Sequence, residues 1–107
     1  MPTIAGKLRH RITFQSPTTT DGDHGGTYET WGDAFTVWAS VGPIRGREYW
    51  ELKKSNSEIE GKIVMRYRED ITPEKRVMFK GRPLKILSVL NPAERREYLE
   101  VYYKEWQ

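Results

Sequence analysis

The sequence predicts an all-β protein, a small β-barrel of about six or seven short antiparallel strands with one long loop near residues 42–57. Three observations lead to this fold class. Short segments of alternating apolar and polar residues recur along the chain, as in strands with one buried face. Turn-forming residues separate these segments about every 8–12 residues. No amphipathic helix pattern is longer than about two turns, and closing the sheet into a barrel would remove its edges.

Two segments in the first half of the chain have the strand pattern. Residues 8–15 alternate between apolar and polar types, and so do residues 35–41, where Phe35 and Val37 begin the inward-facing row. Residues 16–26 are small, polar or turn-forming, which predicts a loop or hairpin tip. Extended structure should resume at residues 27–31, followed by a bend at Gly32-Asp33. Gly42-Pro43 should end the strand, because Pro cannot donate to a ladder.

The second half continues the pattern. Residues 57–68 alternate over the longest stretch and predict the longest strand. Gly81 suits a tight hairpin tip between two short strands, because it can take a positive φ. Asn91-Pro92 should break the returning strand before a short charged connection. The further predicted strands are residues 76–79, 84–90 and 98–106.

The totals restrict the class of protein. The chain has 107 residues, enough for one domain over residues 1–107 with a core of its own. It has no Cys, so it forms no disulfide and uses no thiol chemistry. Its apolar runs are too short to span a bilayer, and residues 1–10 lack the apolar segment of a signal peptide. The net charge of +3 permits contact with DNA or an acidic partner without requiring it.

The loop at residues 42–57 is the candidate working part, because long loops in compact domains are often functional. Its spacing leaves open whether it forms a turn or two of helix. Charged side chains surround large aromatic ones. The candidate residues are Arg45, Arg47, Glu48, Tyr49, Trp50, Glu51, Leu52, Lys53 and Lys54.

Catalytic and metal-binding patterns are missing from the sequence. His10 lies within the first strand pattern, which favours a structural, hydrogen-bonded role. Asp21, Asp23 and His24 lack the spacing of a calcium loop and fit a solvated turn better. No zinc spacing, phosphate-binding loop or nucleophile elbow occurs. We therefore expect no enzyme activity and no cofactor.

A module that binds single-stranded nucleic acid is the alternative. Small β-barrels bind single strands through aromatic side chains flanked by Lys and Arg. Glu48 and Glu51 interrupt the basic character of the loop here and weaken this interpretation. The candidate platform is Trp38, Tyr49, Trp50, Arg45, Arg47, Lys53 and Lys54.

The opening residues 6–15, GKLRHRITFQ, resemble the start of the phage head–tail joining proteins, also called head closure or stopper proteins, of long-tailed phages and prophages. Each further match is short, but the matches follow one another in the family's order along nearly the whole chain. They are residues 25–31 (GGTYETW), 37–41 (VWASV), 46–49 (GREY), 66–68 (RYR), 71–73 (ITP), 76–77 (RV) and 94–96 (ERR).

The resemblance implies a structural virion connector. Such a protein binds the portal or a head-completion adaptor as a ring of identical copies after DNA packaging. The ring closes the DNA exit channel and offers a docking surface to the tail or a tail-completion protein. The resemblance further implies that the loop at residues 42–57 reaches toward the channel axis, which permits contact with packaged DNA. It places the protein in the host cytoplasm during assembly and then at the head–tail connector, and it suggests subunit or partner contacts at Arg9, Arg11, Arg95 and Arg96.

Overall fold

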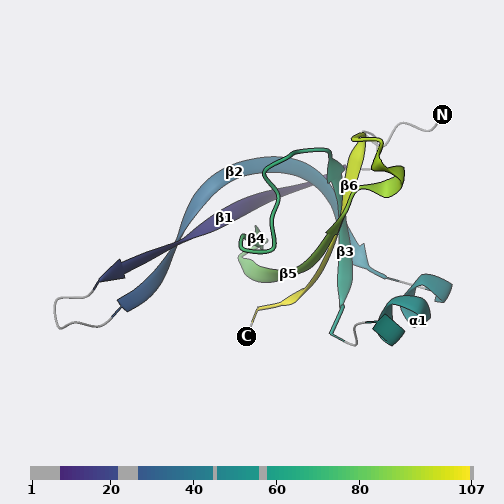
Figure 1. Cartoon of the computed structure of the whole chain (residues 1–107), viewed down its shortest axis with the longest axis horizontal. Helices are drawn as coiled ribbons and strands as arrows, with labels where there is room; N and C mark the ends of the chain where they lie inside the picture. The colour runs from purple at the N-terminus through teal and green to yellow at the C-terminus, as the bar shows by residue number, and fades with distance from the viewer. Residues whose placement is uncertain (1–7, 22–26, 45, 56–57, 107) are drawn as a thin grey trace.

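The computed structural model describes residues 8–21, 27–44, 46–55 and 58–106. Over these residues, six antiparallel strands close into a barrel with the neighbour order β1-β2-β3-β6-β5-β4, and β4 pairs back to β1 (Figure 1). The predicted all-β barrel is therefore confirmed. The elements are β1 (His10–Asp21), β2 (Thr27–Pro43), α1 (Gly46–Ser55), β3 (Gly61–Arg66), β4 (Arg76–Phe79), β5 (Arg82–Leu90), the 3-10 helix η2 (Pro92–Glu94) and β6 (Tyr98–Glu105).

None of the helices within the described ranges is long and apolar enough to cross a membrane.

The barrel interior holds the side chains that alternate inward along the strands. Ile12, Phe14, Ile63 and Val101 are completely buried, and Phe35 packs against them. Burying one such side chain stabilises the fold by about 1.5–3 kcal/mol. The alternation predicted for residues 35–41 and 98–106 is confirmed, because the predicted inward rows lie in or against this core.

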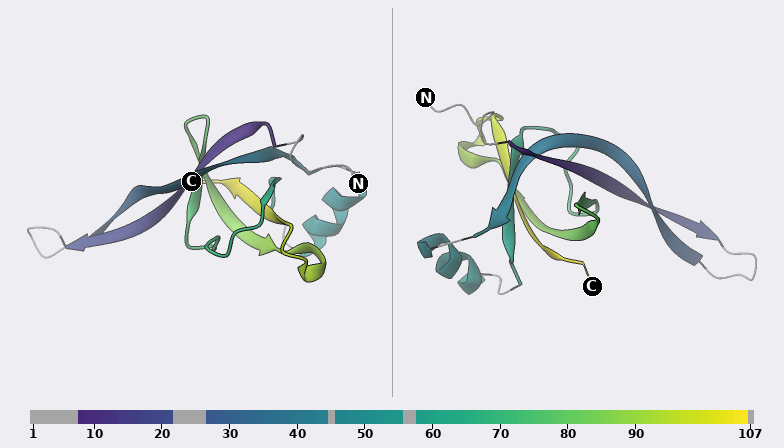
Figure 2. Two further views of the ribbon diagram at one scale, coloured as in Figure 1. Left: turned by 90° about the horizontal axis from the view of Figure 1, so that it is seen from above. Right: turned by 180° about the vertical axis from the view of Figure 1, so that it is seen from behind.

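The β1–β2 pair continues beyond the barrel. The two strands pair along their described length, from His10 opposite Ala39 to Asp21 opposite Thr27. However, β2 pairs with β3 only over residues 39–43, and β1 pairs with β4 only over residues 13–15. The remainder forms a two-stranded ribbon that leaves the barrel (Figures 1 and 2) and lengthens the molecule to 56 × 29 × 26 Å.

Three predictions about these elements are wrong. Residues 16–21 form strand rather than loop, because they pair in register with residues 27–33; residues 22–26 lie outside the described residues. β2 is continuous through Gly32-Asp33, and the irregularity there is a β-bulge in which Ala34 has no partner. Among the described strands, β2 is the longest with 17 residues, whereas β3 has 6. Single backbone hydrogen bonds flank β3, from Glu60 N–H to Tyr103 and from Tyr67 N–H to Glu97.

The remaining predictions at turns are confirmed. Lys80 and Gly81 have φ values of 51° and 78°, the positive pair that a tight β4–β5 hairpin requires. Asn91-Pro92 ends β5, and η2 forms the charged connection to β6. The loop between β2 and β3 contains α1, which answers the question that its spacing left open.

Candidate functional site

Helix α1 contains most of the predicted working residues. The side chains of Arg47, Trp50, Glu51 and Lys54 are exposed, and Glu48 is half-buried. Arg45 lies outside the described residues, as do the side chains of Tyr49, Leu52 and Lys53. In Figures 1 and 2 the helix stands beside the end of the barrel at which β2 ends and β3 begins. The structure therefore presents the described part of this site at one end of the molecule.

A small apolar cluster on the outside of the barrel fixes both ends of the α1 segment. Ile44 precedes the segment and Ile59 follows it, and they are 5% and 3% exposed. Both belong to a cluster with Tyr102 of β6, and Leu87 of β5 packs against it. This cluster is separate from the barrel core, and it places Ile44 and Ile59, which flank the α1 segment, against the β5–β6 wall.

A polar network binds the first turn of α1 to the same wall. Lys62 Nζ of β3 lies 2.9 Å from Glu48 Oε1 and 3.4 Å from Glu100 Oε2. The Tyr102 hydroxyl lies within hydrogen-bond distance of the same two carboxylates, 3.3 Å from Glu48 and 3.1 Å from Glu100. Glu48 is the member that α1 contributes, so this residue connects the helix to the barrel.

Burial and neighbouring charges shift the pKa values of two side chains in this network, Tyr102 and Lys62. Burial raises the pKa of Tyr102, and the nearby Glu100 and Glu48 carboxylates raise it further. Burial alone would lower the pKa of Lys62, but the hydrogen bond to Glu48 and the charge of Glu100 outweigh it and raise the pKa. At neutral pH the network is therefore a protonated lysine and a neutral tyrosine between two carboxylates.

Among the described side chains of α1, Trp50 is the large apolar one. Its side chain is 68% exposed. About two thirds of the indole is therefore open to solvent in the single chain, although Trp50 also makes a contact. Large exposed aromatic side chains are enriched at protein interfaces, because they offer apolar area together with a polar group.

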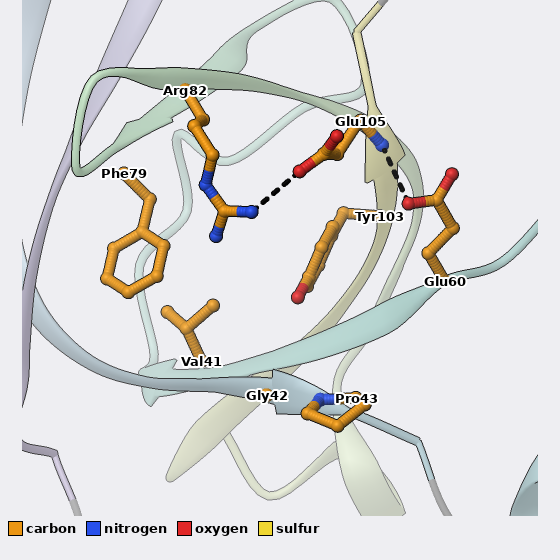
Figure 3. Close-up of a pocket in the computed structure, with 8 residues that line it drawn as sticks. All are labelled: Val41, Gly42, Pro43, Glu60, Phe79, Arg82, Tyr103 and Glu105. Carbon is orange, nitrogen blue, oxygen red and sulfur yellow. Dashed lines mark hydrogen bonds and ion pairs between the residues drawn. The ribbon is translucent and has the colours of Figure 1, made fainter.

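A hollow of about 310 Å³ opens at the same end of the barrel, where Val41 of β2 points toward Phe79 of β4 and Arg82 of β5, beside Tyr103 of β6 (Figure 3). Arg82 Nη1 pairs with Glu105 Oε1 at 2.6 Å on its rim, and the Glu105 N–H donates to Glu60 Oε2 at 3.4 Å. The polar groups on the rim of the hollow thus bind one another. Among the described residues, no group of three or more His, Cys, Asp or Glu side chains could hold a metal ion.

The four arginines predicted as subunit or partner contacts are all exposed. The Arg11 guanidinium lies 4.9 Å from the centre of the Trp38 ring, which is itself 51% exposed. Arg96 donates its backbone N–H to Asn91 Oδ1 at 3.1 Å. Arg9 and Arg11 begin the β1 region and Arg95 and Arg96 follow η2, so they lie on two separate segments.

The structural role expected for His10 is confirmed. Its Nδ1 accepts the Val41 N–H at 3.3 Å, and its ring meets Phe79 edge to face at 5.2 Å. His24 lies outside the described residues. The sequence interpretation missed the Ile44–Ile59–Tyr102 cluster and the Glu48 network. Their only signal was an isoleucine next to each end of a charged loop.

Comparison with known proteins defines the class to which this barrel belongs, the structural proteins of phage virion heads. A family model described as phage head completion protein matches residues 4–105. The chain therefore belongs to the phage head completion protein family, and the resemblance noted in the sequence is confirmed. A search of curated proteins found no match.

Two solved structures are similar over nearly the whole chain. The solution structure of protein SF1141 from Shigella flexneri 2a is 33% identical and covers 96% of each chain with a TM-score of 0.74. A chain from the virion of a native gene transfer agent particle is 19% identical, covers 99% of this chain and 98% of that chain, and has a TM-score of 0.62. The second likeness concerns the fold alone, because the identity is low.

Proposed function

We propose that this protein assembles as a ring on the portal or on a head-completion adaptor after DNA packaging. The ring closes the DNA exit channel and gives the tail or a tail-completion protein its docking surface. The observation that carries the proposal is the match to the head completion family over residues 4–105. The similar fold in a virion particle supports it, because that barrel is part of an assembled virion.

In this proposal α1 is the element that meets its copies in neighbouring subunits. Ile44 and Ile59 hold its ends, and Glu48 holds its first turn, so the helix is attached at defined points while its outer face is exposed. Trp50 supplies apolar contact between copies. Arg47 and Lys54 face packaged DNA or an acidic surface of a neighbouring protein.

The energetics of assembly support a helix that is formed in advance. Fixing one residue's backbone costs roughly 1–2 kcal/mol, and an unstructured loop would meet this cost on assembly. Residues 46–55 are already helical in the single chain. Assembly then has to fix only the position of α1. We expect amide protons of residues 49–53 to exchange faster than those of the barrel in the lone chain and to become protected in the ring.

Light scattering tests the proposal. The mass of the chain is measured alone and then mixed with the portal and adaptor proteins encoded in the same genome. We expect a complex with several copies of the chain per partner ring. A chain that ignores these partners and instead binds single-stranded DNA, with an affinity that falls steeply with salt, would contradict the proposal.

The variant Trp50→Ala tests the contribution of α1 to this assembly. We expect at least tenfold weaker ring formation, because exposed aromatic anchors often carry much of the binding energy of an interface. Trp38→Ala is the matched control, because Trp38 is also an exposed tryptophan but lies on β2. An equal loss in both variants, or in neither, would show that Trp50 is no special contact.

A further inference from the structure

The β1–β2 ribbon extends well beyond the residues that pair with the other strands of the barrel. We call its described part beyond the barrel, residues 16–21 and 27–33, the arm. Apart from the half-buried Trp31, its described side chains are small or polar, and none belongs to either apolar cluster. A two-stranded ribbon is at best marginally stable in water. Apart from Trp31, the described side chains of the arm therefore add nothing to the apolar clusters of their own barrel.

The base of the arm is fixed to the barrel. Trp31 meets Trp106 edge to face at 5.3 Å, and the Arg76 guanidinium of β4 lies 4.5 Å from the Trp31 ring. Arg76 Nε donates to Gln15 Oε1 at 2.8 Å, and Gln15 Nε2 donates to Asp33 Oδ1 at 2.9 Å. These contacts join β1, β2, β4 and the end of β6. The arm consequently leaves the barrel in a defined direction.

Both edges of the arm are open in the described part of the chain. Residues 16–21 pair only with β2, and residues 27–33 pair only with β1, so the outer backbone groups of both strands have no ladder partner. Exposed edges are usually protected by charged residues, Lys above all. Here the sequence has no Lys or Arg between residues 12 and 44, although the chain has 18 in total. The charged residues of the arm are acidic, Asp21, Glu29 and Asp33, and Pro17 has no N–H to donate, so the edges lack lysine but are not without protection. Away from Pro17 they offer unpaired backbone groups to another strand.

We propose that the arm joins neighbouring copies of this chain, the β1 edge of one copy pairing with the β2 edge of the next. The inference rests on the proposed ring. The two edges belong to different strands, so their pairing is head-to-tail, and a head-to-tail contact generates a ring when its rotation closes. If all arms point the same way, β1 of one copy runs antiparallel to β2 of its neighbour. The arms then form one continuous antiparallel sheet around the ring.

Cysteine cross-linking tests this pairing, and the chain has no Cys of its own to interfere. Thr18 and Thr30 are exposed and lie opposite each other in the arm, one on each strand. Chains with Thr18→Cys are mixed with chains with Thr30→Cys, assembled with portal and adaptor, and oxidised. We expect disulfide-linked dimers in the mixture and none with either variant alone.

Further variants provide the register test and the control. Gly32→Cys replaces Thr30→Cys in a second mixture, which allows for a shift of two residues; a Cβ at Gly32 meets nothing within 4 Å. Lys85→Cys, at an exposed position of β5, is the control partner for Thr18→Cys and should give no dimer. Dimers from Thr18→Cys alone would indicate two-fold pairing and overturn the proposal.

Light scattering on the same samples shows whether rings form, and so tests ring formation separately from the contact between arms. If rings form but neither mixture, Thr18→Cys with Thr30→Cys or with Gly32→Cys, gives disulfide-linked dimers, the proposed contact between arms is wrong. The proposed function is then unaffected. The absence of any ring contradicts the proposed function itself. Mixed dimers within rings support both.

Discussion

The Tyr102 hydroxyl lies within hydrogen-bond distance of two carboxylates, Glu48 of α1 and Glu100 of β6. Its pKa is raised above the ordinary 10.0, and the pKa of Lys62 is raised above 10.5. An unfolded tyrosine loses its proton near pH 10, whereas the folded one keeps it. Stability is therefore fully present below about pH 10 and falls as the pH rises further.

Tyr102→Phe tests this linkage. The variant should be less stable at pH 7 by about 1.5–3 kcal/mol, because the hydroxyl that donates to a charged carboxylate is lost. Its stability should also fall less steeply above pH 10, because the tyrosine that ionises preferentially in the unfolded chain is absent. Urea unfolding at pH 8, 9, 10 and 11 measures both effects. Parallel pH profiles for the two proteins would contradict the assignment.

Gly61, at the start of β3, lies against the Tyr103 ring, which would have to shift to make room for a Cβ. The ring of Tyr103 lies directly over it, so an added Cβ would overlap the ring atoms. We expect Gly61→Ala to destabilise the protein by about 1–3 kcal/mol through overpacking. Gly42→Ala is the matched control, because a Cβ at Gly42 in β2 meets nothing within 4 Å. Similar urea midpoints for both variants would disprove this steric role.

At the scale of the element, α1 depends on the two isoleucines at its ends. Truncating a buried isoleucine to alanine costs about 2–5 kcal/mol of local packing. Because the Ile44–Ile59–Tyr102 cluster is separate from the barrel core, Ile59→Ala should loosen α1 more than the strands. Hydrogen exchange should show faster exchange in residues 46–55, with β3 and β6 little changed. Uniformly faster exchange would mean that the cluster and the core are one unit.

The strands that alternate were predictable, and the parts that depend on distant partners were not. Residues 98–106 show their buried face in the sequence itself. Residues 16–21 contain Ser, Pro and Thr, which suit turns as well as strands, and only their pairing with residues 27–33 decides between the two. The charged and aromatic residues of the α1 segment are visible in the sequence, so the segment could be predicted as a candidate site. Its attachment through Lys62 and Tyr102 could not be foreseen, because those residues come from β3 and β6.

At the scale of the whole molecule, a rigid barrel has two extensions of different kinds. Helix α1 stands at one end of the barrel, and the arm leaves it in another direction (Figure 2). In a ring, the arm would connect subunits and α1 would be available to the channel.

Thr18→Lys together with Thr30→Lys should therefore reduce ring formation at least tenfold, because lysines at edges oppose strand pairing. The melting temperature of the lone chain should change little, and a large drop would show instead that the arm stabilises the barrel.

Closure of the DNA exit channel by the proposed ring is tested most directly by nuclease protection of the DNA in filled heads. Heads packaged without this protein are purified, given the purified chain or its Trp50→Ala variant, and treated with nuclease after a mild heat step. We predict that the chain keeps the DNA inside and protected, and that Trp50→Ala protects far less. Equal loss of DNA with and without the chain, while the chain is bound to the heads, would contradict the account.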